Sequence, residues 1–127
     1  MVKTFVVLQN CGTKTSGNME ERIKRIYISL PISHYDLEER KEYAEKVERA
    51  LSQFYEVINP LKNGVDAEEH WSVHMRKDIQ DLLTCDVIFM CENWEWSKGC
   101  KLEHDVATTC GLSVKYEKDS WTPNIKN

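Results

Sequence analysis

The sequence predicts an α/β fold, because short apolar, β-branched runs alternate with amphipathic helical segments along most of the chain. The length of 127 residues suits one domain with one core. No internal repeat or low-complexity segment interrupts the alternation. Strands that alternate with helices pair in parallel through right-handed crossovers. We therefore expect a three-layer α/β/α sandwich, Rossmann- or flavodoxin-like, around a small parallel sheet of four or five strands.

The first half of the regular pattern consists of two strands and a helix. An apolar run at residues 26–30 predicts the first strand, and a helix then runs from a cap at Asp36 to about residue 54. A second strand is expected at residues 55–59 and stops at Pro60. The expected apolar face of the helix consists of Leu37, Ala44, Val47, Leu51 and Phe54.

The second half contains two further helices and two strands. A helix is expected over residues 68–85, with Asp66 as its N-cap. A buried strand begins at residue 86, Ser97 opens the next helix, Gly111 closes it, and the last strand covers residues 112–116. The expected apolar residues are Trp71, Met75, Ile79 and Leu82 in the first helix, and Gly99, Leu102, Val106, Ala107 and Cys110 in the second.

The two ends of the chain do not fit this pattern. Residues 1–22 combine a short apolar start with a loop-like stretch, so we expect an N-terminal appendage or an extra strand there. The domain itself is expected at residues 23–117. An irregular C-terminal tail is expected at residues 118–127.

Composition excludes several classes of protein. The net charge of −4 and the pI near 5.6 argue against a nucleic-acid polymer as partner. The chain has no apolar run long enough to span a membrane. Five cysteines, an odd number without a CxxC pair, predict reduced thiols in a cytoplasmic protein. His70 and His74 are expected to be a surface pair, and no dinucleotide or P-loop fingerprint is present, so neither metal nor cofactor is expected.

Two carboxylates fall on apolar helix faces. With about 100° of rotation per residue, Glu103 lies in the middle of the inward face of its helix, just past the end of a buried strand. Asp78 occupies the corresponding place on the preceding helix. In open α/β sheets, ligands bind beyond the carboxyl ends of the strands, so the two acids could converge on one crevice. The structural alternative is that each acid caps a loop or pairs with a buried arginine.

Three other residues near that edge are candidates for ligand binding. Trp94 and Trp96 could stack on a base, and a hydrophobic lid or a subunit contact explains them equally well. Asn59 ends the second strand and could bind a base or a ribose, although a turn-forming role explains it equally well.

From Tyr27 to about Tyr116 the sequence resembles the nucleoside 2-deoxyribosyltransferase-like family, which includes the 2′-deoxynucleoside 5′-phosphate N-hydrolases. It is similar to small bacterial and phage-borne members of unassigned function. The resemblance is carried by Tyr27-Ile-Ser-Leu-Pro-Ile-Ser33, by Asp78 eight residues before Asp86, and by Ser97-Lys-Gly-Cys-Lys-Leu-Glu103. The order and spacing of these motifs match the family together, whereas no single motif is specific.

The resemblance implies cleavage or transfer of an N-glycosidic bond in a nucleoside or nucleotide. Glu103 would attack C1′, Asp78 would orient the sugar or protonate the departing base, and Tyr27 would place its hydroxyl beside Glu103. Ser97, with Gly99 in the first helical turn and Ser33 in the loop after the first strand, would bind the 5′ end of the substrate. A neighbouring chain often closes the pocket in this family. We therefore expect a homodimer or a higher homo-oligomer, with Trp94, Trp96 and Trp121 as contact area.

Departures from the family pattern keep other functions open, among them Lys101, which stands where the hydrolases tend to have glycine. Leu30 stands where the family usually has glycine, and the loop that follows lacks an arginine for a 5′-phosphate. These changes favour an unusual substrate, or a non-catalytic protein that binds a nucleotide-like small molecule on the same scaffold. A structural or interaction module is a third possibility.

Overall fold

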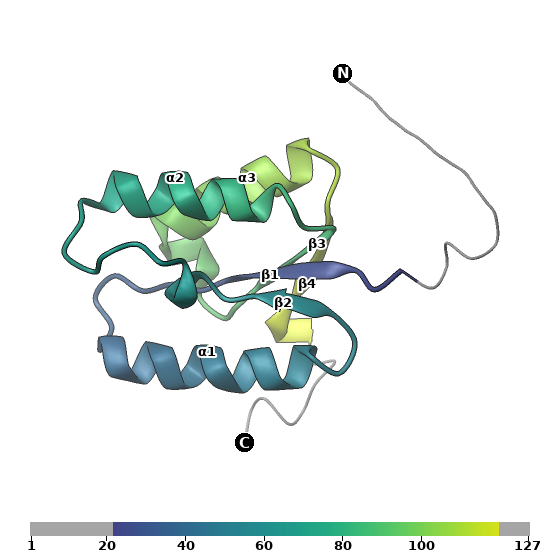
Figure 1. Ribbon diagram of the computed structural model, residues 1–127, viewed down its shortest axis with the longest axis horizontal. Helices are drawn as coiled ribbons and strands as arrows, with labels where there is room; N and C mark the ends of the chain where they lie inside the picture. The colour runs from purple at the N-terminus through teal and green to yellow at the C-terminus, as the bar shows by residue number, and fades with distance from the viewer. Residues whose placement is uncertain (1–21, 120–127) are drawn as a thin grey trace.

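The computed structural model describes residues 22–119, which form a four-stranded parallel sheet with helices on both faces. The sheet has the order β2-β1-β3-β4, and every neighbouring pair is parallel. In Figure 1, α1 covers one face of the sheet while α2 and α3 cover the other. The predicted three-layer α/β/α sandwich is therefore confirmed. The strands are β1 (Arg25–Ser29), β2 (Glu56–Ile58), β3 (Val87–Met90) and β4 (Ser113–Tyr116), and the helices are α1 (Leu37–Leu51), α2 (Trp71–Leu82) and α3 (Lys98–Thr109).

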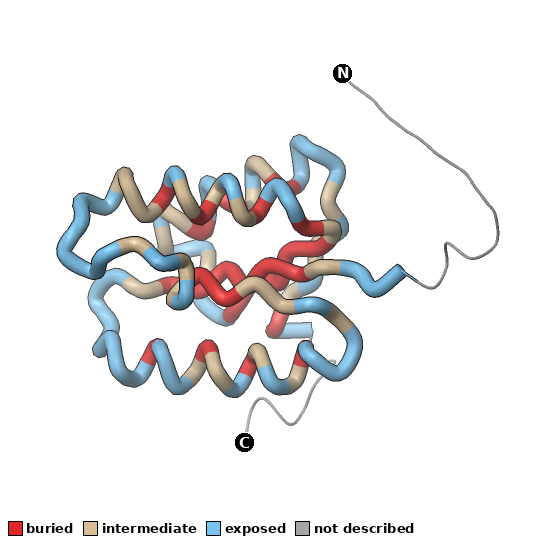
Figure 2. The backbone as a smooth tube through the Cα atoms, viewed as in Figure 1, coloured by how far each residue is buried: buried red, intermediate tan, exposed pale blue. Residues whose placement is uncertain are grey.

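The core consists of two apolar layers, one on each face of the sheet. Alternation along β1 sends Ile26 and Ile28 toward α1, and sends Tyr27 and the side chain two residues later toward α2 and α3. Strand β3 has no exposed residue, as expected for a central strand of a parallel sheet. Figure 2 shows the resulting band of buried residues along the middle of the sheet.

Helix α1 begins as predicted and ends earlier than predicted. The side chain of Asp36 accepts a hydrogen bond from the backbone N–H of Glu39, which confirms the N-cap. The helix stops at Leu51, and Phe54 is 66% exposed, so its expected place on the apolar face is wrong. After residue 51 the chain turns to enter β2, and the helical spacing no longer decides where a side chain points.

Helix α2 is shorter than expected at both ends, because it stops at Leu82. It begins at Trp71, and its cap is His70, whose side chain accepts a hydrogen bond from the backbone N–H of Ser72. The predicted cap at Asp66 is wrong, because that carboxylate accepts from the N–H of Glu68 in a separate turn.

Helix α3 has the predicted caps and a narrower buried face than predicted. Ser97 is its N-cap, and Gly111 follows its C-terminal end with a φ of 85°, a backbone conformation that favours glycine. Cys100 and Glu103 are buried, whereas Leu102 is 41% exposed and Cys110 is also exposed. The expectation that Leu102 and Cys110 belong to the buried face is wrong, because that face is formed by Cys100, Glu103 and Ala107, and because Cys110 lies beyond the last helical residue.

The connections of β1 create the place where a ligand site is expected. The chain leaves β1 for β2 through α1 on one face, and reaches β3 on the other side of β1 through α2 on the opposite face. The order of the strands therefore reverses between β1 and β3, and ligands bind at such a switch point in open α/β sheets. The predicted N-terminal appendage, apart from residue 22, and the tail from residue 120, including Trp121, lie outside the described residues.

Candidate functional site

A cleft of about 790 Å³ opens at the carboxyl edge of the sheet. Its walls come from the loop after β1, from the start of α1, from the segment 60–67 after β2, and from α2 and α3. Asp78 and Glu103 both line this cleft, so the two inward acids meet at one crevice as their helical positions predict.

Glu103 is the most deeply buried acid of the cleft, with 5% of its surface exposed. Its Oε1 accepts a hydrogen bond of 2.7 Å from the Ser29 hydroxyl, and its Oε2 accepts one of 2.8 Å from the Tyr27 hydroxyl. Burial raises the pKa of Glu103 from 4.5 to about 7, while the two hydroxyl donors oppose that rise. The acid and the carboxylate are therefore both populated near neutral pH.

Tyr27 is a permanent donor to this carboxylate. Burial, followed by the charge of Glu103, raises the pKa of Tyr27 well above its usual value. The phenol accordingly keeps its proton throughout the neutral range. The predicted position of Tyr27 beside Glu103 is present in the structure.

Ser29 was missed by the sequence analysis, although a signal for it exists. It is the last residue of β1 and is completely buried. Side chains two positions apart on a strand point to the same face, so Ser29 follows Tyr27 on the face toward α3. A buried hydroxyl needs a hydrogen-bond partner, and Glu103 is the partner here.

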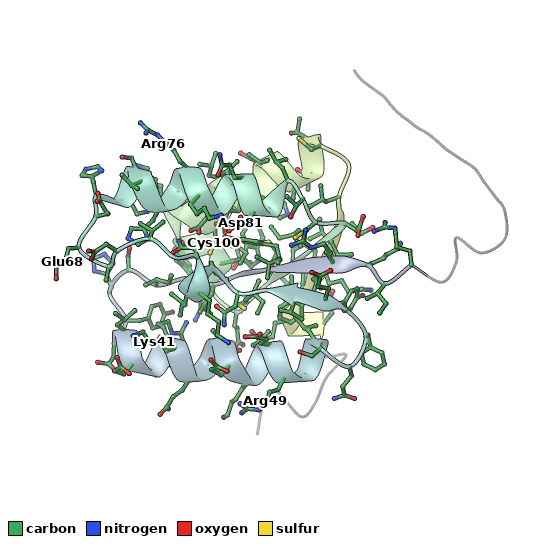
Figure 3. The ribbon with its side chains drawn as sticks, viewed as in Figure 1. Lys41, Arg49, Glu68, Arg76, Asp81 and Cys100 are labelled. Atoms are coloured by element: carbon green, nitrogen blue, oxygen red, sulfur yellow. The ribbon has the colours of Figure 1, made fainter. Side chains whose placement is uncertain are left out.

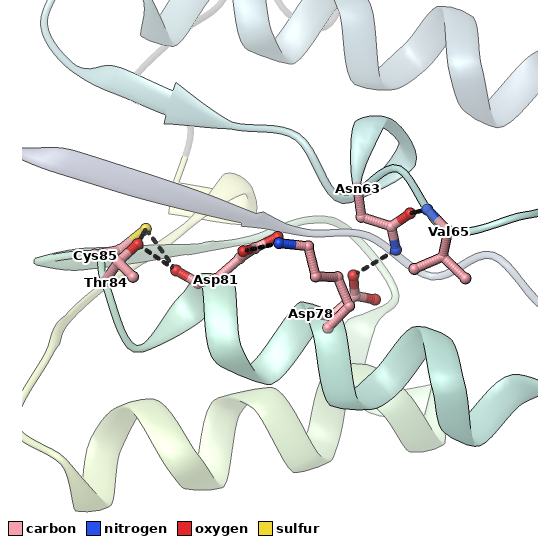
Figure 4. Close-up of polar contacts among 7 residues, drawn as sticks. Asn63, Val65, Asp78, Asp81, Thr84 and Cys85 are labelled. Carbon is pink, nitrogen blue, oxygen red and sulfur yellow. Dashed lines mark hydrogen bonds and ion pairs between the residues drawn. The ribbon is translucent and has the colours of Figure 1, made fainter.

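Asp78 lies on α2 and is tied to the wall of the cleft. Its Oδ1 accepts a hydrogen bond of 2.9 Å from the side-chain amide of Asn63, whose own oxygen accepts from the N–H of Val65 (Figure 4). Burial raises the pKa of Asp78, and the amide of Asn63 opposes the rise. Asn63 was also missed by the sequence analysis, since nothing local marks a loop asparagine as a partner of a residue fifteen positions away.

The contacts of Asp78 and Glu103 bear on the two structural alternatives, which are pairing with a buried arginine and capping of a loop. The partners described for Asp78 and Glu103 are an amide and two hydroxyls, not an arginine. Asp78 does help to hold the loop that contains Asn63, in agreement with a loop-capping role. The bonds of Glu103 come from side chains of a strand, so that acid does not cap a loop.

Three of the predicted substrate-binding residues, Ser33, Ser97 and Gly99, line the cleft. The Ser97 hydroxyl accepts from the N–H of Cys100, which fixes the first turn of α3 beside the cleft. A Cβ on Gly99 would lie 3.3 Å from the sulfur of Met75, which is closer than an ordinary contact. Gly99 therefore lets α2 and α3 approach each other at the floor of the cleft.

The other three predicted binding residues are not among those that line the cleft. Trp94 stacks on His104 with ring centroids 4.4 Å apart and belongs to the packing of α3 on the sheet. Trp96 is 86% exposed. Asn59 is buried, where it caps the turn after β2 and donates to Glu48. Its turn-forming role is thus present in the structure.

The aromatic side chain that does line the cleft is Trp71, in the first turn of α2. It is 43% exposed, and the ammonium of Lys98 lies 5.0 Å from its ring centroid. The sequence analysis placed Trp71 in the core, because its spacing from Met75 matches an apolar helix face. That spacing does bring both residues to one side of α2, and at this end of the helix that side is the wall of the cleft.

The loop after β1 presents a leucine where a ligand would approach. Leu30 lines the cleft and also packs in the core on the α1 side of the sheet. Arg40 lies behind the same loop, where it donates to the carbonyl of Pro31 and pairs with Glu39. The guanidinium of Arg40 therefore supports the loop and is not among the groups that line the cleft. The cationic side chains that line the cleft are those of Lys41 and Lys98.

The described residues set two further limits. Residues 22–119 contain no group of three or more histidine, cysteine, aspartate or glutamate side chains arranged to hold a metal ion. Within the same range, no helix combines the length and apolar character needed to cross a membrane.

Comparison with known proteins supplies the family. No curated protein matches the chain. The sequence pattern of a family described as Domain of unknown function (DUF4406) matches residues 24–116, a stretch that contains all four strands, all three helices and both carboxylates of the cleft. The chain therefore belongs to the DUF4406 family.

Proposed function

We propose that this protein cleaves or transfers the N-glycosidic bond of a nucleoside or nucleotide, with Glu103 as the nucleophile. The observation that carries the proposal is the Glu103 carboxylate, which lines the cleft while two buried hydroxyls hold its oxygens. A side chain fixed in this way has little rotational freedom to lose when it attacks a bound sugar. The resemblance of the sequence motifs to nucleoside 2-deoxyribosyltransferase-like proteins agrees with this chemistry.

The proposed reaction has two steps. An oxygen of Glu103 forms a bond to C1′ as the bond from C1′ to the base nitrogen breaks, and the base leaves with that electron pair. The base takes up a proton, for which Asp78 is the candidate donor. In the second step, water or the nitrogen of another base attacks C1′, gives up its proton to the Asp78 carboxylate, and releases the Glu103 carboxylate.

The two acids have suitable environments for different roles. Burial raises the pKa of Asp78, which favours the protonated form that an acid catalyst needs. Burial raises the pKa of Glu103 to about 7, and the hydroxyls of Tyr27 and Ser29 oppose that rise, so the ionised form that a nucleophile needs is populated at neutral pH. The charge of Asp78 also raises the pKa of Glu103, so the two groups are near enough to influence each other.

The test is a panel of deoxynucleosides and their 5′-monophosphates incubated with the protein, with free base measured by liquid chromatography. Glu103→Gln should lower base release by several orders of magnitude. Asp105→Asn removes an exposed carboxylate of the same helix and serves as the matched control, with activity retained. Base release by Glu103→Gln at the wild-type rate would contradict the proposed nucleophile.

A non-catalytic nucleotide-binding role is the second candidate. It is favoured by the position of Leu30 in the cleft and by the engagement of Arg40 behind the loop. In that case the wild type releases no base, yet a nucleotide raises its melting temperature by mass action. A protein that neither releases base nor is stabilised by any nucleotide of the panel would overturn both candidates.

We further propose a cytoplasmic protein that assembles into a homodimer or a higher oligomer. The four cysteines among the described residues are free, which suits a reducing compartment. Trp96 and Leu102 expose apolar surface on and next to α3. Light scattering at tens of micromolar protein tests the assembly, and a monomeric mass would contradict it.

A further inference from the structure

We propose that Ser29 is the positioning residue that keeps Glu103 ionised and oriented. This inference rests on the proposed role of Glu103 as the nucleophile, and neither the sequence motifs nor the family match assigns a role to Ser29.

Ser29 occupies a position where a parallel strand normally carries an apolar side chain. It is completely buried, and its hydroxyl donates to Oε1 of Glu103 over 2.7 Å. Tyr27 occupies the other carboxylate oxygen, so each oxygen of Glu103 has its own donor. Tyr27 and Ser29 both lie on β1, whereas Glu103 lies on α3. The two hydrogen bonds therefore fix the rotation of the Glu103 carboxylate and its distance from the sheet.

The hydroxyl of Ser29 has one proton and two lone pairs. That proton is used for Oε1 of Glu103. Cys100 is buried in the layer between the sheet and α3 that also contains Tyr27, whereas Arg49 and Arg76 point outward (Figure 3). Ser29 therefore makes its bond in a buried layer, where a hydrogen bond is stronger than in water.

The bond from Ser29 acts against the effect of burial on Glu103. Burial raises the pKa of Glu103 to about 7, and the hydroxyls of Ser29 and Tyr27 oppose that rise. Ser29 therefore favours the ionised acid.

The experiment measures the ionisation of Glu103 directly, without substrate. Protein with ¹³C-labelled glutamate side chains is titrated by NMR, and the Glu103 signal is assigned by its absence in Glu103→Gln. Ser29→Ala should raise the pKa of Glu103 by about one unit, the size expected for one hydroxyl donor to a carboxylate. The ionised fraction at pH 7 should then fall about fivefold.

Controls separate this role from a general loss of packing. Ser33→Ala removes a cleft hydroxyl other than the two that donate to Glu103, and should leave the pKa of Glu103 unchanged. Ser29→Thr retains the hydroxyl and should restore the wild-type pKa.

The outcomes distinguish this inference from the proposed function. An unchanged Glu103 pKa in Ser29→Ala would overturn the inference. If Ser29→Ala fails to fold, Ser29→Thr still tests the inference. A folded Ser29→Thr variant in which the pKa of Glu103 differs from the wild-type value would refute the role of the hydroxyl. If the pKa changes as expected while the wild type releases no base, the proposed reaction is wrong and the role of Ser29 remains. If base is released, the acid limb of kcat/KM should move to higher pH in Ser29→Ala.

Discussion

The buried Glu103 should make the stability of this protein depend on pH in a way that one substitution removes. In the unfolded chain this carboxyl titrates near 4.5, and in the folded protein near 7. A group with a raised folded-state pKa contributes its full stabilisation below the unfolded value, and loses it as the pH rises through the folded value. The wild type should therefore lose stability from about pH 4.5 to just above pH 7.

The magnitude follows from the same two values. Each pKa unit corresponds to about 1.4 kcal/mol, so the rise from 4.5 to about 7 corresponds to about 3 kcal/mol in total. Most of this change falls between pH 5 and pH 8. In Glu103→Gln the side chain does not titrate, so the free energy of unfolding of the variant relative to the wild type should rise by about 2 to 3 kcal/mol over that interval.

The assay is urea denaturation of both proteins at pH 5, 6, 7 and 8, with the midpoint and the slope fitted separately. Comparing the variant with the wild type at each pH cancels the titration of every other group that the two proteins share. Asp105→Asn is the matched control, because it removes an exposed carboxylate from the same helix and should show no such trend. A stability difference between Glu103→Gln and the wild type that stays constant from pH 5 to pH 8 would refute the assignment of the raised pKa to Glu103.

Three further predictions concern the walls of the cleft. Asn63→Ala should raise the pKa of Asp78, because it removes the amide that donates to the carboxylate, and NMR titration of the labelled side chain measures the change. Gly99→Val should destabilise the protein by about 1 to 3 kcal/mol in urea denaturation, since even a Cβ at this position is crowded by α2, and an unchanged midpoint would contradict the close approach of the helices. Trp71→Ala should weaken the binding of any nucleoside that stabilises the wild type, whereas Trp96→Ala should not. Equal effects of the two substitutions in calorimetric titrations would contradict the location of the ligand in the cleft.

The sequence predicts the architecture well because the signals for it are local. The strand at 87–90 is apolar throughout, and the caps at Asp36, Ser97 and Gly111 depend on residues within a few positions of each helix end. The inward placement of Asp78 and Glu103 likewise follows from helical spacing alone. Local periodicity does not fix the width of the buried face of a helix, and Leu102 lies outside the narrow face that Cys100, Glu103 and Ala107 form.

The partners of the two acids could not be predicted in the same way. Asn63 and Asp78 are 15 residues apart, and Ser29 and Glu103 are 74 residues apart, so their contacts exist only once α2 and α3 are packed on the sheet. The tryptophans illustrate the same limit. Three of them flank the cleft region in the sequence, and only the packing of the helices decides that Trp71 lines it while Trp94 stacks on His104.

A comparison of two buried glutamates favours a functional role for Glu103. Glu117 is 3% exposed and accepts hydrogen bonds from the hydroxyl of Tyr43 and from the backbone N–H of Glu92, so it joins the turn after β4 to the loop after β3. Glu103 instead accepts its hydrogen bonds from two side chains and lines the cleft. Its buried charge lowers the free energy of unfolding at neutral pH, a cost that an uncharged glutamine would avoid. A residue selected for stability alone would not be ionisable at that position. The cost is explained if the carboxylate reacts with a ligand in the cleft, because a reactive group needs a site that water does not fill.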